Sequence, residues 1–304
     1  MNYHIPVEVD IAEIADNDLF RVSRKIYPSG LSSSLKLTGM LEIPWIIKNS
    51  PGYIALTCHN RIKILRESGI KSLKCHVLND PDVHVFMNYV SLKAYRNELG
   101  PAGKLKFILL LTDTFKISDM AVSEYCKKNL KLPDDVINDR KFIERFFLFQ
   151  DSLITYLDEK DISLRIIRDL INLPSNWLGI ISNWTAHVQI RVNFFKMIIE
   201  NISDIYRRGD HISVIESILY EDDKTLYDEV YRIRYPRYTK MKTESDFIIR
   251  NLTGPGLSID FPEYFDRSFI TIKLNIDKKS DCSGQLKKIT AMNPARLNEL
   301  ISLL

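Results

Sequence analysis

The sequence predicts a mixed α+β protein in three parts: a small α/β domain, an all-α middle domain and a small α+β element at the C-terminus. Strand-like and helix-like patterns alternate over roughly the first eighty residues, and a helical hydrophobic period takes over from about residue 85. Short alternating patterns return after the break Gly254-Pro255-Gly256. The 304 residues suffice for about two domains of ~150 residues or three small ones. The predicted boundaries are 1–85, 86–220 and 221–304.

The first part shows a β–turn–β–α–β order. Apolar, β-branched runs separated by Asn49-Ser50-Pro51-Gly52 and Gly69 indicate short strands around one amphipathic helix. The predicted strands are Asp18–Ser23, Ile43–Lys48, Tyr53–Thr57 and Ser72–Leu78, and the predicted helices are Ser32–Thr38 and His59–Ser68.

The middle part consists of helical patterns with polar or prolyl connections, as helical bundles have. The predicted helices are Val85–Asn97, Lys104–Thr112, Asp119–Leu130, Asp139–Phe149, Leu153–Asp158, Leu164–Ile171, Trp177–Trp184 and Gln189–Asn201.

The last part begins with a basic stretch, Tyr231–Lys242, whose proline and alternation indicate an extended linker. Leu257–Phe261 and Ser268–Ile276 read as two strands. Ala291–Leu304 reads as a closing helix, with Asn293 as the N-cap and Pro294 in the first helical position.

Composition excludes several classes of protein. The net charge is +3 and no segment forms a basic tail, so nucleic-acid binding would need local patches. The four cysteines lack CxxC spacing and the six histidines lack ligand spacing, so we expect no metal site and no disulfide framework. The N-terminus has no unbroken apolar stretch and no run approaches the ~20 residues that span a bilayer. We therefore expect a cytoplasmic protein with no membrane partner.

One stretch carries family information. A serine-led helix with a following glycine, Gly39, precedes an apolar strand, and a second strand leads into the box Cys58-His59-Asn60-Arg61, which opens a helix. This order over residues 18–80 resembles the N-terminal domain of the ParB/sulfiredoxin superfamily. The resemblance implies a nucleotide-responsive or anion-responsive domain, followed in ParB-like members by a helical domain with a helix-turn-helix.

The physics of the box fits a phosphate site. A helix N-terminus presents free N–H groups and a positive dipole to an anion. His59, Asn60 and Arg61 would add side-chain donors in the first turn. The alternative is that His59 and Asn60 cap the helix and Arg61 is a solvated charge.

The chain departs from the family pattern at two places. Cys58 stands where the box opens with glycine, and its side chain would crowd a closely approaching phosphate. We interpret it as a buried replacement for glycine, with a reactive thiol as the alternative. Members that bind cytidine triphosphate (CTP) carry a second box, in which Arg96, Leu99 and Pro101 match.

The Glu and Asn of that second box are Leu92 and Lys93 here, so the oxygen ligands for Mg²⁺ are missing. Lys93 can supply part of the metal's charge to a phosphate but cannot ligate a cation. The resemblance therefore implies CTP or another nucleotide as ligand without a metal. It also implies weak or absent hydrolysis, so we favour a protein that is not an enzyme.

The helical domain offers the first candidate DNA contacts. Residues 117–133 and 139–148 loosely resemble the family's helix-turn-helix, whose second helix would enter a major groove. Interleaved acidic residues favour a solvated face as the alternative. The candidate phosphate contacts are Lys127, Lys128, Lys131, Arg140, Lys141 and Arg145.

A second candidate patch is the Tyr231–Lys242 stretch. Interleaved tyrosine and arginine can stack on bases and pair with phosphates, which favours single-stranded nucleic acid. Arg232, Arg234 and Arg237 are the candidate contacts there, and a solvated linker is the alternative.

The preferred hypothesis is a ParB-like DNA-binding protein of bacterial type, associated with the nucleoid. Plasmid partition or chromosome segregation is what the resemblance implies, with transcriptional regulation close behind, and a homodimer is expected. The alternatives are a phosphoryl-transfer or small-molecule kinase enzyme of the same superfamily, with Arg61 and Lys93 on phosphates, and an inactive scaffold.

Overall fold

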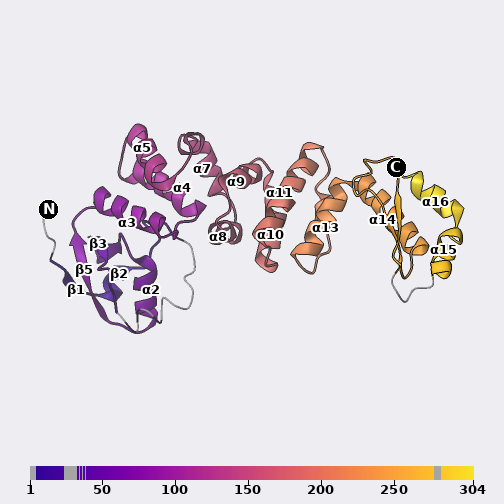
Figure 1. Ribbon diagram of the computed structural model, residues 1–304. Helices are drawn as coiled ribbons and strands as arrows, with labels where there is room; N and C mark the ends of the chain where they lie inside the picture. The colour runs from indigo at the N-terminus through magenta and orange to yellow at the C-terminus, as the bar shows by residue number, and fades with distance from the viewer. Residues whose placement is uncertain (1–4, 24–32, 34, 36, 38, 277–281) are drawn as a thin grey trace. The chain divides into compact units, whose positions relative to one another are not determined.

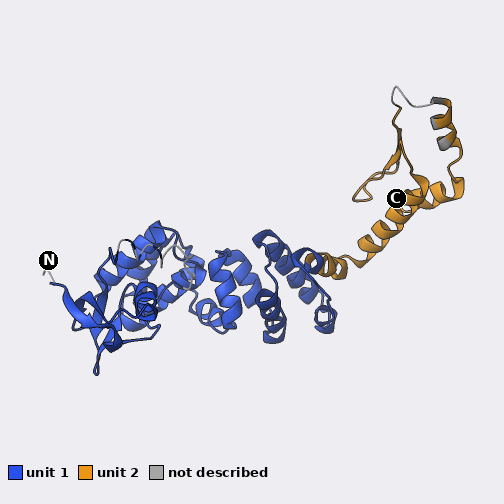
Figure 2. Ribbon diagram, turned by 90° about the horizontal axis from the view of Figure 1, so that it is seen from below, with its two compact units in different colours: residues 1–226 blue, residues 227–304 orange. Residues whose placement is uncertain are grey.

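The fold class is confirmed: a small mixed sheet is followed by many helices and then by a second, two-stranded sheet (Figure 1). The computed structural model describes residues 5–23, 33, 35, 37, 39–276 and 282–304. The chain divides into two compact units, Met1–Leu226 and Tyr227–Leu304 (Figure 2). The finer division into three parts stays a prediction.

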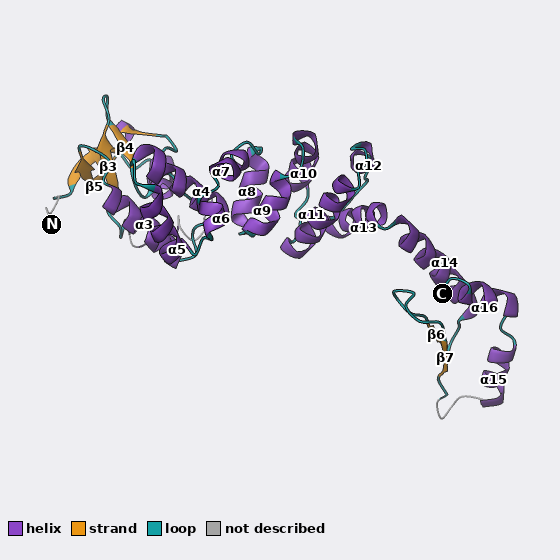
Figure 3. Ribbon diagram, turned by 90° about the horizontal axis from the view of Figure 1, so that it is seen from above, coloured by secondary structure: helices purple, strands orange, loops and turns teal. Residues whose placement is uncertain are grey.

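The N-terminal sheet has the strand order β1-β5-β3-β4-β2. Figure 3 shows its strands in orange, with β3, β4 and β5 labelled. β5 pairs antiparallel with β1 and parallel with β3, while β4 pairs antiparallel with β3 and parallel with β2. The strands are β1 Val7–Asp10, β2 Ile14–Ala15, β3 Trp45–Lys48, β4 Tyr53–Ala55 and β5 Ser72–Leu78. The predicted strands are confirmed at β3, β4 and β5, whereas the two edge strands were not predicted.

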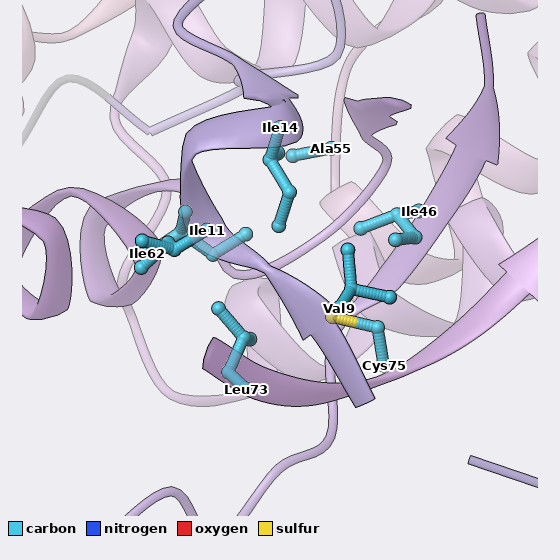
Figure 4. Packing of buried hydrophobic residues seen from close by; sticks show 8 residues of the cluster. All are labelled: Val9, Ile11, Ile14, Ile46, Ala55, Ile62, Leu73 and Cys75. Carbon is cyan, nitrogen blue, oxygen red and sulfur yellow. The ribbon is translucent and has the colours of Figure 1, made fainter. Parts of the chain in front are cut away.

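A core of aliphatic side chains lies between this sheet and helix α2, His59–Glu67 (Figure 4). Ile62 is the buried residue of α2, and it joins the cluster together with Cys75 of β5, which is fully buried. Because burial of each such side chain contributes about 1.5–3 kcal/mol, the cluster fixes the start of α2 against the sheet. The other members are Val9, Ile11, Ile14, Ile46, Ala55 and Leu73.

The predicted strand Asp18–Ser23 is wrong, because these residues form a turn followed by irregular chain. Phe20 and Val22 are buried, which explains the alternation, but the Phe20 ring packs on rings outside the sheet. Its centroid lies 5.7 Å from that of Phe86 and 5.9 Å from that of Phe115. Of the predicted helix Ser32–Thr38, residues 33, 35 and 37 are helical and the others lie outside the described residues.

The helices of the first unit follow the predicted order. All eight predicted helices are confirmed in position as α3, α4, α5, α7, α8, α9, α10 and α11, with ends shifted by up to several residues; the one-turn helices α6 and α12 were not predicted. Within the described ranges, no helix combines the length and apolar character that crossing a bilayer requires. The helices are α3 Val83–Tyr95, α4 Pro101–Leu109 with a π-helical extension Leu110–Thr114, α5 Asp119–Leu130, α6 Asp134–Ile137, α7 Arg140–Phe146, α8 Asp151–Glu159, α9 Leu164–Ile171, α10 Ser175–His187, α11 Val192–Arg207 and α12 Ser213–Glu216.

The N-terminus of α4 is held by a buried carboxylate from α8. Asp158 is fully buried, and its Oδ1 accepts the backbone N–H groups of Ala102 at 2.9 Å and Gly103 at 3.3 Å. A Cβ at Gly103 would overlap the Val22 carbonyl, and one at Gly100 would overlap Asp158. These close contacts hold α4 against α8 and against the chain segment around Val22.

The predicted extended conformation of Tyr231–Lys242 is wrong. This stretch lies in α13, Asp223–Arg234, and α14, Pro236–Leu252. Pro236 occupies the first turn of α14, where a missing N–H costs nothing, so it starts a helix.

The second unit contains a hairpin and two further helices. β6, Leu257–Asp260, pairs antiparallel with β7, Thr271–Leu274, and both were predicted. Helix α15, Cys282–Thr290, was not predicted, whereas α16, Pro294–Ile301, has the predicted N-cap: the Asn293 side chain accepts the N–H of Ala295 at 2.9 Å.

Candidate functional site

A cavity of about 120 Å³ lies at the N-terminus of α2, bounded by the start of that helix, by α3 and by the segment around Val22. All five residues predicted to bind nucleotide or phosphate line it, namely His59, Asn60, Arg61, Lys93 and Arg96. The two sequence boxes, about thirty residues apart, therefore meet at one site.

Cys58 sets the direction in which α2 starts. Its backbone is left-handed, with φ 61° and ψ 21°, and its carbonyl accepts the N–H groups of Arg61 and Ile62 at 3.0 Å. Its own N–H donates to the Tyr89 hydroxyl of α3 at 3.2 Å. This left-handed turn is the reason the position favours glycine.

The Cys58 thiol is buried, and burial raises its pKa above the usual range for cysteine. A thiol that stays protonated is a poor nucleophile. The environment therefore favours a structural role for Cys58 over a reactive one.

His59 is the most unusual polar side chain of the cavity. Both ring nitrogens are buried, and neither has a hydrogen-bond partner among the residues that the structure describes. Burial, together with the nearby Arg21 guanidinium, lowers the pKa of His59 to about 3. The ring is therefore neutral, with one N–H and one lone pair unpaired in the described structure.

Arg61 and Arg96 are bridged by a carboxylate that the sequence did not single out. Glu42 Oε2 lies 2.8 Å from Arg61 Nη1, and Glu42 Oε1 lies 2.7 Å from Arg96 Nη1. Glu42 precedes β3 and is separated by many residues from both arginines, so no local motif marks it. In this conformation a carboxylate occupies the place where the sequence predicts a phosphate.

Lys93, in the last turn of α3, also lines the cavity. It is 9% exposed, and its Nζ lies 2.9 Å from Glu98 Oε2 and 5.2 Å from the centre of the Tyr89 ring. Leu92, the other replaced position of the second box, also lines the cavity.

The electrostatics favour an anionic ligand. Four cationic side chains (Arg21, Arg61, Lys93 and Arg96) face two carboxylates (Glu42 and Glu98) around the cavity. Among the described residues, no three His, Cys, Asp or Glu side chains form a group that could hold a metal ion. Guanidinium and ammonium groups around a helix N-terminus can bind phosphate oxygens directly.

The candidate DNA contacts fall into two groups in the structure. Lys127 pairs with Asp134 at 2.6 Å, and Arg140 pairs with Asp113 at 2.7 Å and with Glu144 at 2.8 Å. The hydrogen bond from Arg140 holds the pKa of Asp113 below its usual range. Lys128, Lys131, Lys141 and Arg145 are exposed, and no ion pair joins them to the part of the chain that the structure describes.

The predicted second helix of the helix-turn-helix is shorter than expected. The Asp139 side chain accepts the N–H of Phe142 at 2.9 Å and caps α7, which ends at Phe146 instead of the predicted Phe149. The single-turn α6, which was not predicted, precedes it. Lys141 and Arg145 project from α7, while Lys128 and Lys131 lie at the end of α5.

The three arginines of the second patch lie on α13 and α14. Arg232 pairs with Glu229, and the Arg234 guanidinium lies 4.6 Å from the centre of the Tyr235 ring. Arg237 is exposed. The tyrosines contact other aromatic rings, with Tyr231 4.8 Å from Tyr235 and 6.1 Å from Tyr238, and Tyr235 remains exposed.

No protein-family model and no curated protein matches the sequence. Among solved structures, the chain is similar to the C-terminally truncated chromosome-partitioning protein ParB from Caulobacter crescentus. The likeness to its complex with CTP-γ-S covers 60% of this chain and 99% of that chain, at 14% identity and a TM-score of 0.26. The likeness to its complex with the centromeric parS site covers 64% and 98%, at 13% identity and a TM-score of 0.30. A likeness of this level assigns no function to the chain.

Proposed function

We propose that this protein binds a nucleotide by its phosphates at the α2 site and binds DNA through its helical part, as a ParB-like protein of the partition or regulatory type. The observation that carries the proposal is the meeting of Arg61, Lys93 and Arg96 at one helix N-terminus. Cations from two separate sequence boxes converge there on a cavity that also contains the unpaired His59 ring.

Calorimetry with CTP, ATP and pyrophosphate tests the nucleotide part. Loss of a charge-assisted contact costs about 1.5–3 kcal/mol, so Arg61→Ala and Arg96→Ala should each weaken binding by roughly ten- to a hundredfold. Lys63→Ala is the matched control, because Lys63 is an exposed cation on the same helix outside this cavity. Absence of heat for the wild type with all three ligands contradicts the proposal.

The same site is proposed to hydrolyse nucleotide weakly or not at all. Leu92 and Lys93 replace the pair that would hold Mg²⁺, and Lys93 is already paired with Glu98. Steady, Mg²⁺-dependent phosphate release that disappears in Arg96→Ala would favour the phosphoryl-transfer alternative.

The DNA part rests on the exposed cations of α5 and α7. If Lys128 and Lys141 each neutralise one phosphate, replacing either with alanine should reduce the log–log salt slope of duplex binding by about 0.9. Lys48→Ala, an exposed lysine of β3, serves as the control and should leave the slope unchanged. Fluorescence anisotropy with duplex DNA at several salt concentrations measures the slope. If the wild-type protein does not bind duplex DNA at low salt, the DNA part of the proposal is wrong, and the scaffold or enzyme alternative replaces it.

A further inference from the structure

Glu42 stands between two hollows of the first unit. It lines the cavity at the N-terminus of α2 and also a neighbouring pocket of about 520 Å³, and Cys58, Tyr89 and Leu92 line both as well. We propose that Glu42 is a displaceable internal competitor: its carboxylate occupies the phosphate position, and the ligand must displace it to bind. This inference rests on the proposed nucleotide function.

The chemistry of the contacts supports competition. Each carboxylate oxygen of Glu42 accepts from a different arginine, as two oxygens of one phosphate group would. A guanidinium recognises carboxylate and phosphate oxygens with the same donors. A phosphate that binds Arg61 and Arg96 must therefore replace the Glu42 carboxylate as the acceptor of their hydrogen bonds.

The volumes of the cavity and of the neighbouring pocket also support displacement of Glu42 by the ligand. Small-molecule sites occupy about 300–1,000 Å³, so a cavity of about 120 Å³ is too small for a nucleotide while Glu42 closes it. The neighbouring pocket falls within that range. Its wall includes Trp45 stacked on His76, with ring centroids 4.4 Å apart, a surface suited to a planar group. Movement of Glu42 would join the two spaces into one site for a planar base and its phosphates.

The chain around Glu42 permits such a movement. Gly39 is fixed by its bond to the Leu35 carbonyl at 3.0 Å, and Trp45 is fixed by donating to Thr57 Oγ1 at 3.0 Å. Between these points the chain has no regular secondary structure, and Leu41 is 78% exposed. The Glu42 carbonyl accepts from the Cys58 thiol at 4.0 Å, and the Pro44 carbonyl accepts the N–H of His76 at 2.8 Å. The Glu42 carboxylate would therefore leave the arginines by rotation of its side chain, which does not disturb β3. Its two ion pairs are partly exposed and correspondingly weak.

Titration calorimetry with pyrophosphate and CTP, with and without Mg²⁺, tests the inference on the full chain. Glu42→Gln removes the competing charge, so it should bind pyrophosphate roughly tenfold more tightly than the wild type. Glu67→Gln is the matched control. It removes the same charge from the exposed last residue of α2, outside the cavity, and leaves both arginines paired with Glu42, so its gain should be clearly smaller.

The outcomes separate the inference from the proposed function. If Arg61→Ala weakens binding but Glu42→Gln binds no more tightly than the wild type, the competitor role is wrong and the nucleotide site stands. If Glu67→Gln binds pyrophosphate as tightly as Glu42→Gln does, the gain comes from net charge alone, and the inference is also wrong. If Glu42→Gln binds pyrophosphate or CTP more weakly than the wild type only when Mg²⁺ is present, Glu42 is a metal ligand, and the competitor role is wrong. If neither the wild type nor Glu42→Gln binds either ligand, the site and the inference fall together.

Discussion

At the scale of single residues, the box that opens α2 contains two side chains in uncommon states. Cys58 has a left-handed backbone, which costs a residue with a Cβ about 1–2 kcal/mol. His59 has buried ring nitrogens without described partners. Strained backbone and unpaired polar groups destabilise the folded state and are concentrated at functional sites, where the rest of the fold offsets the lost free energy.

The strain at Cys58 predicts an inverted order of stability for two substitutions. Both Cys58→Gly and Cys58→Ala lose the buried sulfur, but only glycine relieves the left-handed conformation. Cys58→Gly should therefore be more stable than Cys58→Ala by roughly 0.5–1 kcal/mol in urea unfolding. Cys126, buried within α5, is the control: there the glycine variant should be the less stable by about 1 kcal/mol. The same order at both positions would contradict the explanation.

The His59 ring predicts a pH dependence of stability. Its pKa is about 3 in the folded protein and near 6.5 in the unfolded chain, so below pH 6.5 the unfolded state binds the additional proton. The free energy of unfolding should fall as the pH drops from about 6.5 toward 4, by up to about 1.4 kcal/mol per pH unit for one proton.

Urea unfolding of the wild type and His59→Gln at pH 7, 6 and 5 measures this effect. The difference between the two proteins isolates His59 from Asp18, which lies near it and whose own pKa is lowered. The stability of His59→Gln should decline less steeply with falling pH. Parallel declines would show that His59 takes up its proton in the folded state.

Local pattern accounts for part of the site. Arg61 follows a strand and opens a helix, which a local pattern can predict, whereas Arg96 was predicted from its match to the second box that the family resemblance implies. Glu42 could not be predicted, because its partners are distant along the chain and the ion pairs form only once α2 and α3 are packed together. The pairing of Arg140 with Asp113 was missed for the same reason.

At the scale of elements, the start of α4 depends on a distant cap. Asp158→Ala would leave the N–H groups of Ala102 and Gly103 buried without their acceptor and should cost about 2–3 kcal/mol of stability. Asp139→Ala, which removes the exposed cap of α7, should cost only about 1 kcal/mol. Thermal or urea unfolding of both variants makes the comparison. Equal costs would mean that burial adds nothing to this cap.

Two predicted elements are wrong for different physical reasons. The alternation of Phe20 and Val22 predicts a strand, but burial against helices gives the same pattern as burial in a sheet. There the tertiary partner, which the local sequence does not contain, decides the conformation. Pro236 predicts an extended linker, but at the first turn of a helix proline is favourable.

At the scale of the whole molecule, the two units differ in how much they bury. Among the described residues, the hydrophobic cluster of the second unit contains five buried residues, whereas the cluster at the N-terminal sheet contains eight. Hydrogen exchange followed by mass spectrometry should therefore show α14, β6, β7 and α16 opening at a lower free energy than β3, β5 and α8. Equal protection of both sets would contradict this expectation.

The fold class and the order of elements were predictable because hydrophobic period and turn residues are local signals. The edge strands β1 and β2 could not be predicted. In β1, Val9 lies between two exposed acidic residues, so the alternation of apolar and polar side chains is weak. Short helices such as α6 contain too few residues to establish a period.

The junction at α4 has a consequence for how relatives of this chain can diverge. Gly100 and Gly103 lack side chains because Asp158 and the Val22 carbonyl fill the space that a Cβ would need. Loss of the Asp158 side chain would not free Gly100, because the backbone carbonyl of residue 158 would still lie 2.5 Å from a Cβ at position 100. In an alignment of descendants from one ancestor, positions 100 and 103 should consequently remain glycine even where position 158 and the surrounding surface have changed.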